Sequence, residues 1–190
     1  MTYILRFDTS PRSTESVSRN LANKVEQHLL ELDKKLFVKT RNLSTVGLPH
    51  ISNDTITGFY TPTEDMTTEL KEATTLSNEL IHELKAADTL LISSPMYNFG
   101  IPSSLKAWVD QIVRINQTFS FDSSSFEGLV PVKRAVLVLA YGAERLCPQW
   151  RFCSNEFPRT LSHFSIGISR YPRHSSHSYR RYNRATRDVD

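Results

Sequence analysis

The stretch Thr89-Leu90-Leu91-Ile92-Ser93, followed directly by Ser94-Pro95-Met96-Tyr97-Asn98-Phe99-Gly100, decides the fold class. Its first part is a short continuous apolar run, which is typical of a strand buried on both faces of a parallel sheet. The second part contains a proline, a glycine and two aromatic rings, which indicate a stiff loop rather than a continuing strand. The sequence therefore predicts a buried strand that ends in a rigid, aromatic loop.

Other segments of the chain repeat this alternation of strand and helix. Runs rich in β-forming residues predict three more strands, at residues 3–7, 36–40 and 135–140. Apolar residues at helical spacing, and a proline suited to a first turn, predict helices at residues 16–32, 70–84 and 102–115. Residues 42–65 are polar and turn-rich, so we expect a long loop there. This order predicts an α/β fold, a doubly wound parallel sheet with helices on both faces.

The fold class predicts where a ligand would bind. In doubly wound sheets, ligands lie beyond the carboxyl ends of the strands, near the point where the strand order reverses. The loops that follow Phe7, Ser93 and Ala140 are therefore the predicted site.

The first of these loops offers groups that can hold a phosphate. Ser10, Ser16 and Ser18 lie ahead of and within the first turn of the predicted helix, where hydroxyls and free backbone N–H groups favour anions. The sequence has no Gly-x-Gly-x-x-Gly and no P-loop lysine, so a monophosphate held by neutral donors fits better than a dinucleotide. The alternative is that Ser16 is only an N-cap. Arg12 and Arg19 could add charge, although surface arginines usually have no specific role.

The second loop offers surface for a flat ring. Tyr97 and Phe99 supply aromatic faces for stacking, and the Asn98 amide supplies both a donor and an acceptor. The alternative is a rigid turn with core aromatics.

Two further segments are weaker candidates. In the third loop, Gly142 would let the backbone approach a ligand closely, and Tyr141 could cover one end of a ring. Phe119 and Phe121 alternate with polar residues, which indicates a short strand or arm. As exposed aromatics they would suggest a dimer contact or a lid over a ring, and core packing is the alternative.

In this order, these segments resemble the flavodoxin-like family of FMN-dependent NAD(P)H:quinone oxidoreductases and azoreductases. The resemblance runs from about Tyr3 to Ala143. Its most specific part is the stretch from Pro95 to Asp110, and Thr118-Phe119 and Gly128-Leu129-Val130 come next.

The resemblance implies a cofactor, a reaction and a set of contacts. It implies a homodimer with FMN at the interface, which accepts a hydride from NADH or NADPH and passes two electrons to a quinone or azo compound. No side chain would act as a nucleophile. The FMN contacts that it implies are Ser10, Ser16, Val17 and Ser18 at the phosphate, Pro95, Met96, Tyr97, Asn98 and Phe99 at the ring, and Tyr141 and Gly142 in a further loop. Phe119, with Phe121 near it, would help form the substrate pocket above the ring.

Beyond Ala143 the sequence departs from this family. Residues 1–143 carry a net charge of −2, whereas residues 144–190 carry +5, with nine arginines and no lysine. Translation one base later from Glu144, with suitable synonymous codons, can give NGYAPSGDFAAMNFQEPYL, which is similar to the Gly-rich loop and helix that the family has next. We therefore expect two regions, a flavodoxin-like FMN-binding domain at 1–143 and an atypical, frameshifted tail at 144–190. The region of the fifth strand would then be disrupted.

Two other functions stay open on sequence grounds. A flavodoxin-like electron carrier would share the fold, but carriers are usually acidic around the flavin and residues 1–143 are nearly neutral. The tail alternates basic and aromatic residues at 179–184, as nucleic-acid-binding segments do. Cys147 and Cys153 with the nearby histidines match no zinc spacing, so no metal is expected. The chain has no signal-peptide pattern and no long apolar run, so a cytoplasmic protein without a membrane span is expected.

Overall fold

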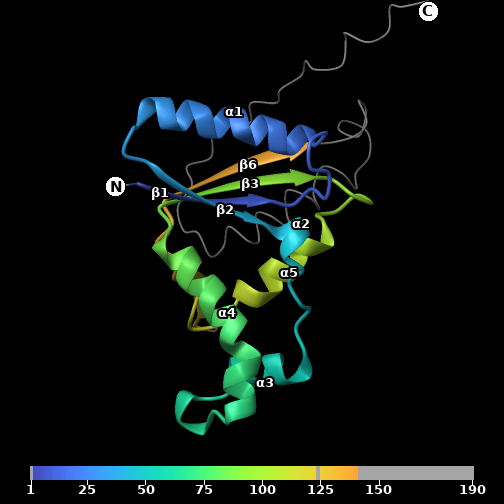
Figure 1. Cartoon of the computed structure of the whole chain (residues 1–190). Helices are drawn as coiled ribbons and strands as arrows, with labels where there is room; N and C mark the ends of the chain where they lie inside the picture. The colour runs from blue at the N-terminus through green and yellow to red at the C-terminus, as the bar shows by residue number, and fades with distance from the viewer. Residues whose placement is uncertain (1, 123–124, 141–190) are drawn as a thin grey trace, which may run out of the picture.

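The computed structural model of the chain describes residues 2–122 and 125–140 (Figure 1). Four parallel strands form its main sheet, in the order β2-β1-β3-β6. The strands are β1 (Tyr3–Asp8), β2 (Phe37–Asn42), β3 (Thr89–Pro95) and β6 (Arg134–Ala140). All four predicted strands are confirmed. The chain order reverses between β1 and β3, because β2 lies on one side of β1 and the later strands lie on the other.

The three predicted helices are also confirmed, as α1 (Val17–Leu32), α4 (Thr68–Ala86) and α5 (Ser103–Ile112). Two of them begin at hydroxyl caps: the Ser16 side chain accepts from the N–H of Arg19, and that of Thr67 accepts from Leu70. Helix α5 begins directly after Pro102, whose fixed φ suits a helix start.

Alternate residues of the sheet face two separate apolar layers. Ile4, Leu91 and Val138 pack with Ala22 of α1 on one face. The other face, covered by α4 and α5, holds the larger layer (Figure 1). This arrangement confirms the expectation of helices on both faces, and it follows from the period of two along each strand.

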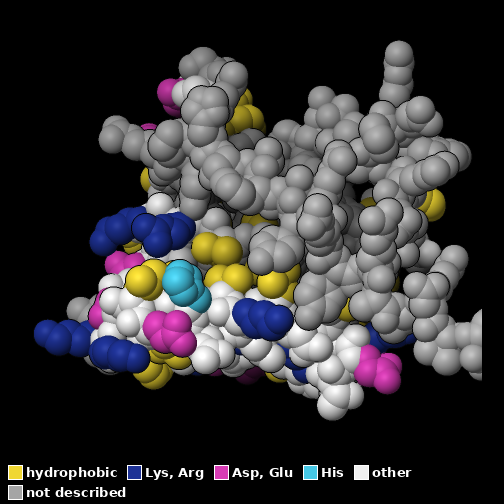
Figure 2. Space-filling model, turned by 90° about the horizontal axis from the view of Figure 1, so that it is seen from above, with side chains coloured by type: hydrophobic (Ala, Val, Ile, Leu, Met, Phe, Trp, Pro, Cys, Tyr) yellow, Lys and Arg dark blue, Asp and Glu magenta, His cyan; other side chains and the backbone are white. Residues whose placement is uncertain are grey.

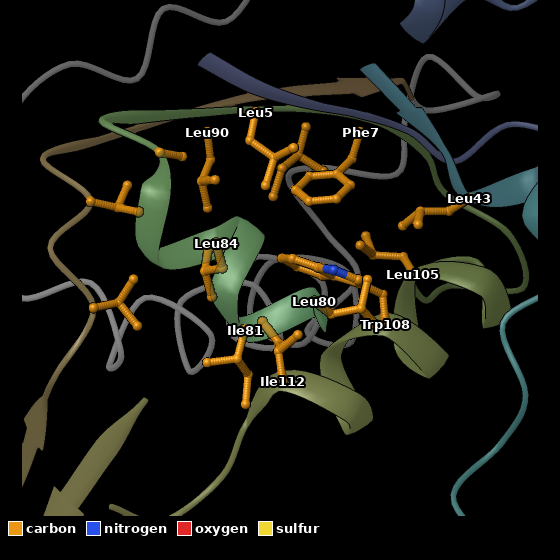
Figure 3. Close-up of a cluster of buried hydrophobic side chains, with 14 residues drawn as sticks. Leu5, Phe7, Leu43, Leu80, Ile81, Leu84, Leu90, Leu105, Trp108 and Ile112 are labelled. Atoms are coloured by element: carbon orange, nitrogen blue, oxygen red, sulfur yellow. The ribbon is translucent and has the colours of Figure 1, made fainter. Parts of the chain in front are cut away.

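Trp108 of α5 lies at the centre of the larger layer (Figure 3). Its ring is fully buried, and its centroid lies 4.2 Å from the centroid of Phe7 in β1. Leu80 and Leu84 of α4 and Leu90 of β3 surround the pair. This contact fixes α5 against the sheet and thereby fixes the loop between β3 and α5.

The prediction of a long loop at residues 42–65 is wrong. The structure has two short α-helices there, α2 (Leu43–Val46) and α3 (Asn53–Tyr60), and a 3-10 turn, η1 (Thr63–Asp65). Ser52 and Thr55 form a reciprocal capping box at the start of α3, and Leu43 is buried in the core. The helices are held by caps and packing, so polar composition alone gave the wrong prediction.

A two-stranded antiparallel hairpin follows α5. It consists of β4 (Phe119–Phe121) and β5 (Phe126–Gly128), with Phe119 opposite Gly128. The short strand predicted around Phe119 and Phe121 is therefore present. The ring centroids of Phe121 and Phe126 lie 4.6 Å apart, and both side chains are exposed.

The sheet ends at β6 in the part of the chain that the structure describes, where β3 is its hydrogen-bonded neighbour. The predicted division at residue 143 and the region of a fifth strand lie outside the described residues. Of the helices in residues 2–122 and 125–140, none has the length and hydropathy needed to cross a membrane.

Candidate functional site

Two of the three predicted loops leave the sheet side by side. Strands β1 and β3 pair in parallel with Asp8 opposite Ser93, so both chains leave the sheet at the same edge. Just beyond the strands, the N–H and the hydroxyl of Thr9 both donate to the Ser93 carbonyl, at 3.1 and 2.9 Å. On the other side of β3, the N–H of Met96 donates to the carbonyl of Ala140 at 2.9 Å. The end of β6 therefore lies at the same edge.

The first loop brings its three predicted serines to the start of α1. Ser10, Ser16 and Ser18 are all buried, and the hydroxyls of Ser16 and Ser18 lie 3.3 Å apart. The N–H of Arg12 donates to the Ser10 hydroxyl at 3.3 Å. Ser16 is indeed an N-cap, but its hydroxyl hydrogen can still be donated to a ligand.

Val17 occupies the first position of α1 with its side chain largely exposed. The first N–H groups of an α-helix lack intrahelical acceptors, and the helix dipole favours an anion beside them. What Val17 can offer to a ligand at this position is therefore its backbone N–H and not its side chain.

A buried charge network supports the first loop from below. Asp8, at the end of β1, accepts hydrogen bonds from Arg6 at 3.0 to 3.2 Å and from the Ser93 hydroxyl at 2.7 Å. Arg6 also donates to Glu26 of α1 at 2.6 Å. Arg19 completes the group, with its Nε 3.6 Å from a carboxylate oxygen of Asp8.

This network was not predicted from the sequence. Arg6 and Asp8 are two residues apart in one strand and so lie on the same face. The sequence did contain one signal of this network, which is a charged pair at this spacing in an apolar strand directly before the loop. Arg19 was expected at most to add charge to the first loop, and the structure shows that its guanidinium contacts both Asp8 and the loop.

The second loop is a tight two-residue turn. The N–H of Tyr97 donates to the carbonyl of Gly100 at 3.1 Å, and the N–H of Gly100 donates to the carbonyl of Tyr97 at 2.9 Å. The two residues between them, Asn98 and Phe99, have φ values of 48° and 64°. This is the geometry of a type I′ turn, which needs positive φ at both central positions. Asparagine tolerates that region, whereas an aromatic residue there is strained.

The turn displays its side chains to solvent. Tyr97 and Phe99 are 39% and 60% exposed, and Asn98 is exposed as well. Pro95 ends β3, and Met96 is half-buried against the main core. The alternative of a rigid turn with core aromatics is therefore wrong for these two rings. The turn is rigid, but its rings are open to a ligand or a partner.

The hairpin that carries Phe119 and Phe121 lies elsewhere. Just before β4, the Gln117 side chain accepts from Lys85, in the last turn of α4, at 3.4 Å. Just before β6, the N–H of Lys133 donates to Asp88, the residue ahead of β3. Both contacts are at the amino-terminal edge of the sheet. Within one chain, the hairpin therefore adjoins the edge opposite to the loops. Core packing does not account for Phe121, which is 48% exposed.

Two predicted site residues, Tyr141 and Gly142, lie outside the described residues, as do Cys147 and Cys153. Within residues 2–122 and 125–140, no three His, Cys, Asp or Glu side chains gather as they would around a metal ion.

The chemistry of the donor set fits a ligand with two different ends. Buried hydroxyls at a helix N-terminus suit an anionic group. Exposed aromatic and amide side chains in the loop after the neighbouring strand suit a flat ring. Because β1 and β3 are adjacent, one molecule with a phosphate and an aromatic ring system can contact both.

Comparison with known proteins supports the same interpretation. The family model for the flavodoxin-like fold matches residues 2–162. An FMN-dependent NADH:quinone oxidoreductase from Xanthobacter autotrophicus is 46% identical over 143 residues, which are 75% of this chain and 69% of that protein. One from Nostoc punctiforme is 41% identical over 144 residues, 76% of this chain and 70% of that protein.

Solved structures have the same fold. An azoreductase from Bacillus anthracis matches with a TM-score of 0.78 at 22% identity, covering 88% of this chain and 82% of that one. An FMN-dependent NADH-azoreductase from Bacillus anthracis, solved in complex with FMN, matches with a TM-score of 0.71 at 25% identity. This match covers 89% of this chain and 84% of that one.

Proposed function

Since the chain belongs to the flavodoxin-like family of FMN-dependent NADH:quinone oxidoreductases, we propose that it binds FMN and reduces quinones or azo compounds. The electrons would come from NADH or NADPH. The observation that carries the proposal is the adjacency of two loops, the serine-rich start of α1 and the aromatic turn at Tyr97–Gly100. FMN supplies the redox chemistry when bound, and the protein supplies binding, orientation and exclusion of water.

The phosphate end of FMN is assigned to the start of α1. Ser10, Ser16 and Ser18 would donate hydroxyl hydrogen bonds, and Val17 would donate its backbone N–H. The burial of the three serines supports this role, because hydrogen bonds to an anion are stronger where water is excluded.

The isoalloxazine ring is assigned to the second loop. Tyr97 and Phe99 would contact its faces or edges, and Asn98 would hydrogen bond to its polar rim. Pro95 and Met96 would form the floor beneath it. Tyr141 and Gly142 would approach the ring from the next strand. The rigid turn supports this assignment, since a fixed backbone costs little entropy on binding.

We assign the substrate pocket to the interface between the two copies of a homodimer. Phe119 and Phe121 lie on a hairpin at the opposite edge of the same chain's sheet, so they would reach a flavin only in a second copy. The exposed rings of Phe121 and Phe126 support an interface there, because aromatic side chains are enriched in protein contacts.

We infer that the tail, residues 144–190, is translated from a shifted reading frame, and that the shift begins near residues 143 and 144. If residues 144–190 are the product of such a shift, the sheet lacks its authentic fifth strand, and FMN affinity and dimerisation are weakened. Sequencing the gene across this point tests the assignment. A continuous frame with no family-like alternative translation would contradict it.

Two other functions are less well supported. On the face over α1, the described surface carries Lys and Arg side chains interspersed with Asp and Glu (Figure 2). Such mixing is not typical of an acidic electron carrier. The nucleic-acid-binding alternative rests on the basic tail at residues 144–190, which lies outside the described residues. We also propose a cytoplasmic location, because the proposed reaction needs a supply of NADH or NADPH.

Steady-state kinetics test the function. The full chain, reconstituted with FMN, is given NADH and either a benzoquinone or an azo dye, and NADH oxidation is followed. An enzyme consumes NADH in proportion to acceptor over many turnovers. An electron carrier binds FMN but turns over only when a separate reductase is added, and that result would contradict the proposed activity.

A further inference from the structure

The side chain of Arg19 ties the first loop to the sheet. Its Nη2 donates to the carbonyl of Ser10 at 2.9 Å, and its Nη1 lies 3.5 Å from the carbonyl of Ser13. Its Nε points toward Asp8, with a nitrogen–oxygen distance of 3.6 Å. One guanidinium thus contacts both ends of the Ser10–Ser13 segment and the end of β1.

Asp8 is a fixed anchor for this contact. Its carboxylate is held by Arg6 and by the Ser93 hydroxyl, and it is only 5% exposed. The Nε atom of Arg19 is buried and has no hydrogen-bond acceptor within ordinary distance. The attraction to Asp8 is therefore ionic, and the directional hydrogen bonds of Arg19 go to the loop carbonyls.

These contacts of Arg19 define the backbone conformation of the loop. Ser10 and Ser16 flank the five residues 11–15, which have no regular secondary structure. Without a tether, such a stretch samples many conformations, and ordering it on binding costs free energy. A tether from Arg19 to the carbonyls of Ser10 and Ser13 would reduce that cost.

We propose that Arg19 is a positioning residue, which holds the Ser10–Ser13 segment in the conformation that receives the phosphate of FMN. This inference rests on the proposed function. It adds a residue that would touch the loop backbone and not the cofactor. It also gives Asp8, a buried carboxylate beside an anion site, the role of fixing the guanidinium.

Arg12 provides a matched control. It lies in the same loop and carries the same charge, but its side chain is exposed. Among the described residues, its hydrogen bond to the site is made by its backbone N–H, at the Ser10 hydroxyl. If Arg19 acted only by attracting an anion through its charge, Arg12 would act similarly. If Arg19 acts by holding the loop, Arg12 would not.

The experiment measures the affinity of the full, flavin-free chain for FMN and for riboflavin, which lacks the phosphate. Arg19→Gln is expected to weaken FMN binding by about tenfold to a hundredfold, the effect of losing hydrogen bonds from a charged group. Riboflavin binding should change less than about threefold, and Arg12→Gln should behave like the wild type. Arg19→Lys keeps the charge but loses the fork that reaches two carbonyls, so it should resemble Arg19→Gln.

In the binding experiment, three outcomes would overturn the inference: equal losses in Arg19→Gln and Arg12→Gln, equal losses for FMN and riboflavin, or a wild-type affinity in Arg19→Lys. Hydrogen exchange in the flavin-free chain supplies a readout that needs no cofactor. Arg19→Gln should speed exchange of the Arg12 amide, which donates to the Ser10 hydroxyl within the segment that Arg19 holds, without lowering the melting temperature by more than a few degrees. Unchanged exchange there would overturn the inference even if the wild type did not bind FMN, and failure of the wild type to bind FMN would contradict only the proposed function.

Discussion

Tyr97 and Gly100 hydrogen bond to each other in both directions through their backbones, at 3.1 and 2.9 Å. This pairing closes a turn whose central residues, Asn98 and Phe99, both have positive φ. Strain of this kind persists only where the surrounding structure fixes it, and it is concentrated at functional sites. The turn is therefore the most informative local feature of the candidate site.

Replacement of Phe99 tests the strain directly. Phe99→Gly should raise the free energy of unfolding by about 1 kcal/mol relative to Phe99→Ala, because alanine keeps the Cβ that disfavours the left-handed region. The ring is 60% exposed, so both variants lose little core packing. Chemical denaturation of the flavin-free chains measures the difference. Equal stability of the two variants would mean that residue 99 does not have this backbone conformation in solution.

The ion cluster around Glu83 makes stability depend on pH. Glu83 of α4 accepts from Arg41 at 2.8 Å and from Lys39 at 2.6 Å, both in β2. Burial alone would raise the pKa of Glu83, but the hydrogen bonds from Arg41 and Lys39 outweigh it and lower the pKa below the ordinary 4.5. A lowered pKa stabilises the fold above the ordinary value, and this stability is lost as the pH falls through the lowered one.

Glu83→Gln should therefore cost about 2 kcal/mol at neutral pH, where the wild type has the charged hydrogen bonds. The difference should begin to shrink as the pH falls below the ordinary pKa of a glutamate, and it should be lost below the lowered pKa of Glu83, where the folded-state carboxylate is protonated. Thermal melts across pH measure it. Asp110→Asn, which removes an exposed pairing with Lys106 on one helix, is the control and should change stability by less than about 0.5 kcal/mol. A constant difference between Glu83→Gln and wild type at all pH values would contradict this explanation.

Close packing of α3 on α4 depends on Gly58. A Cβ at this position would lie 2.6 Å from the Cγ2 of Thr74 and 3.3 Å from the carbonyl oxygen of Leu70. Gly58→Ala should therefore destabilise the fold by about 1–3 kcal/mol. Thr74→Ser removes the clashing methyl and keeps the hydroxyl that donates to Leu70. The double variant should recover part of the loss in a denaturation experiment, whereas additive losses would contradict the predicted contact.

The sequence predicted the sheet well because its strands are apolar runs with a clear period. The strand at Thr89–Pro95 and the helix at Val17–Leu32 have strong local signals, and both are present. The helices in residues 42–65 were missed because their stability comes from the capping box at Ser52 and from burial of Leu43. Local composition does not reveal such tertiary contributions.

The candidate site was predictable in part. Loop positions follow from fold class, so the sequence alone was enough to expect Ser10, Ser16 and Ser18 near the loop that carries Tyr97. The contacts of Arg19 with Asp8 and the loop carbonyls could not be predicted, because they depend on side-chain geometry across separate segments. The location of the Phe119 hairpin at the opposite edge of the sheet likewise depends on how the chain returns after α5.

Titration of the flavin-free, full-length chain with FMN, followed by its visible absorption spectrum, tests the central claim most directly. We predict saturable, equimolar binding, a shifted flavin band, and bleaching of that band when NADH is added without oxygen. Failure of the correctly folded chain to bind FMN even in large excess would contradict the claim.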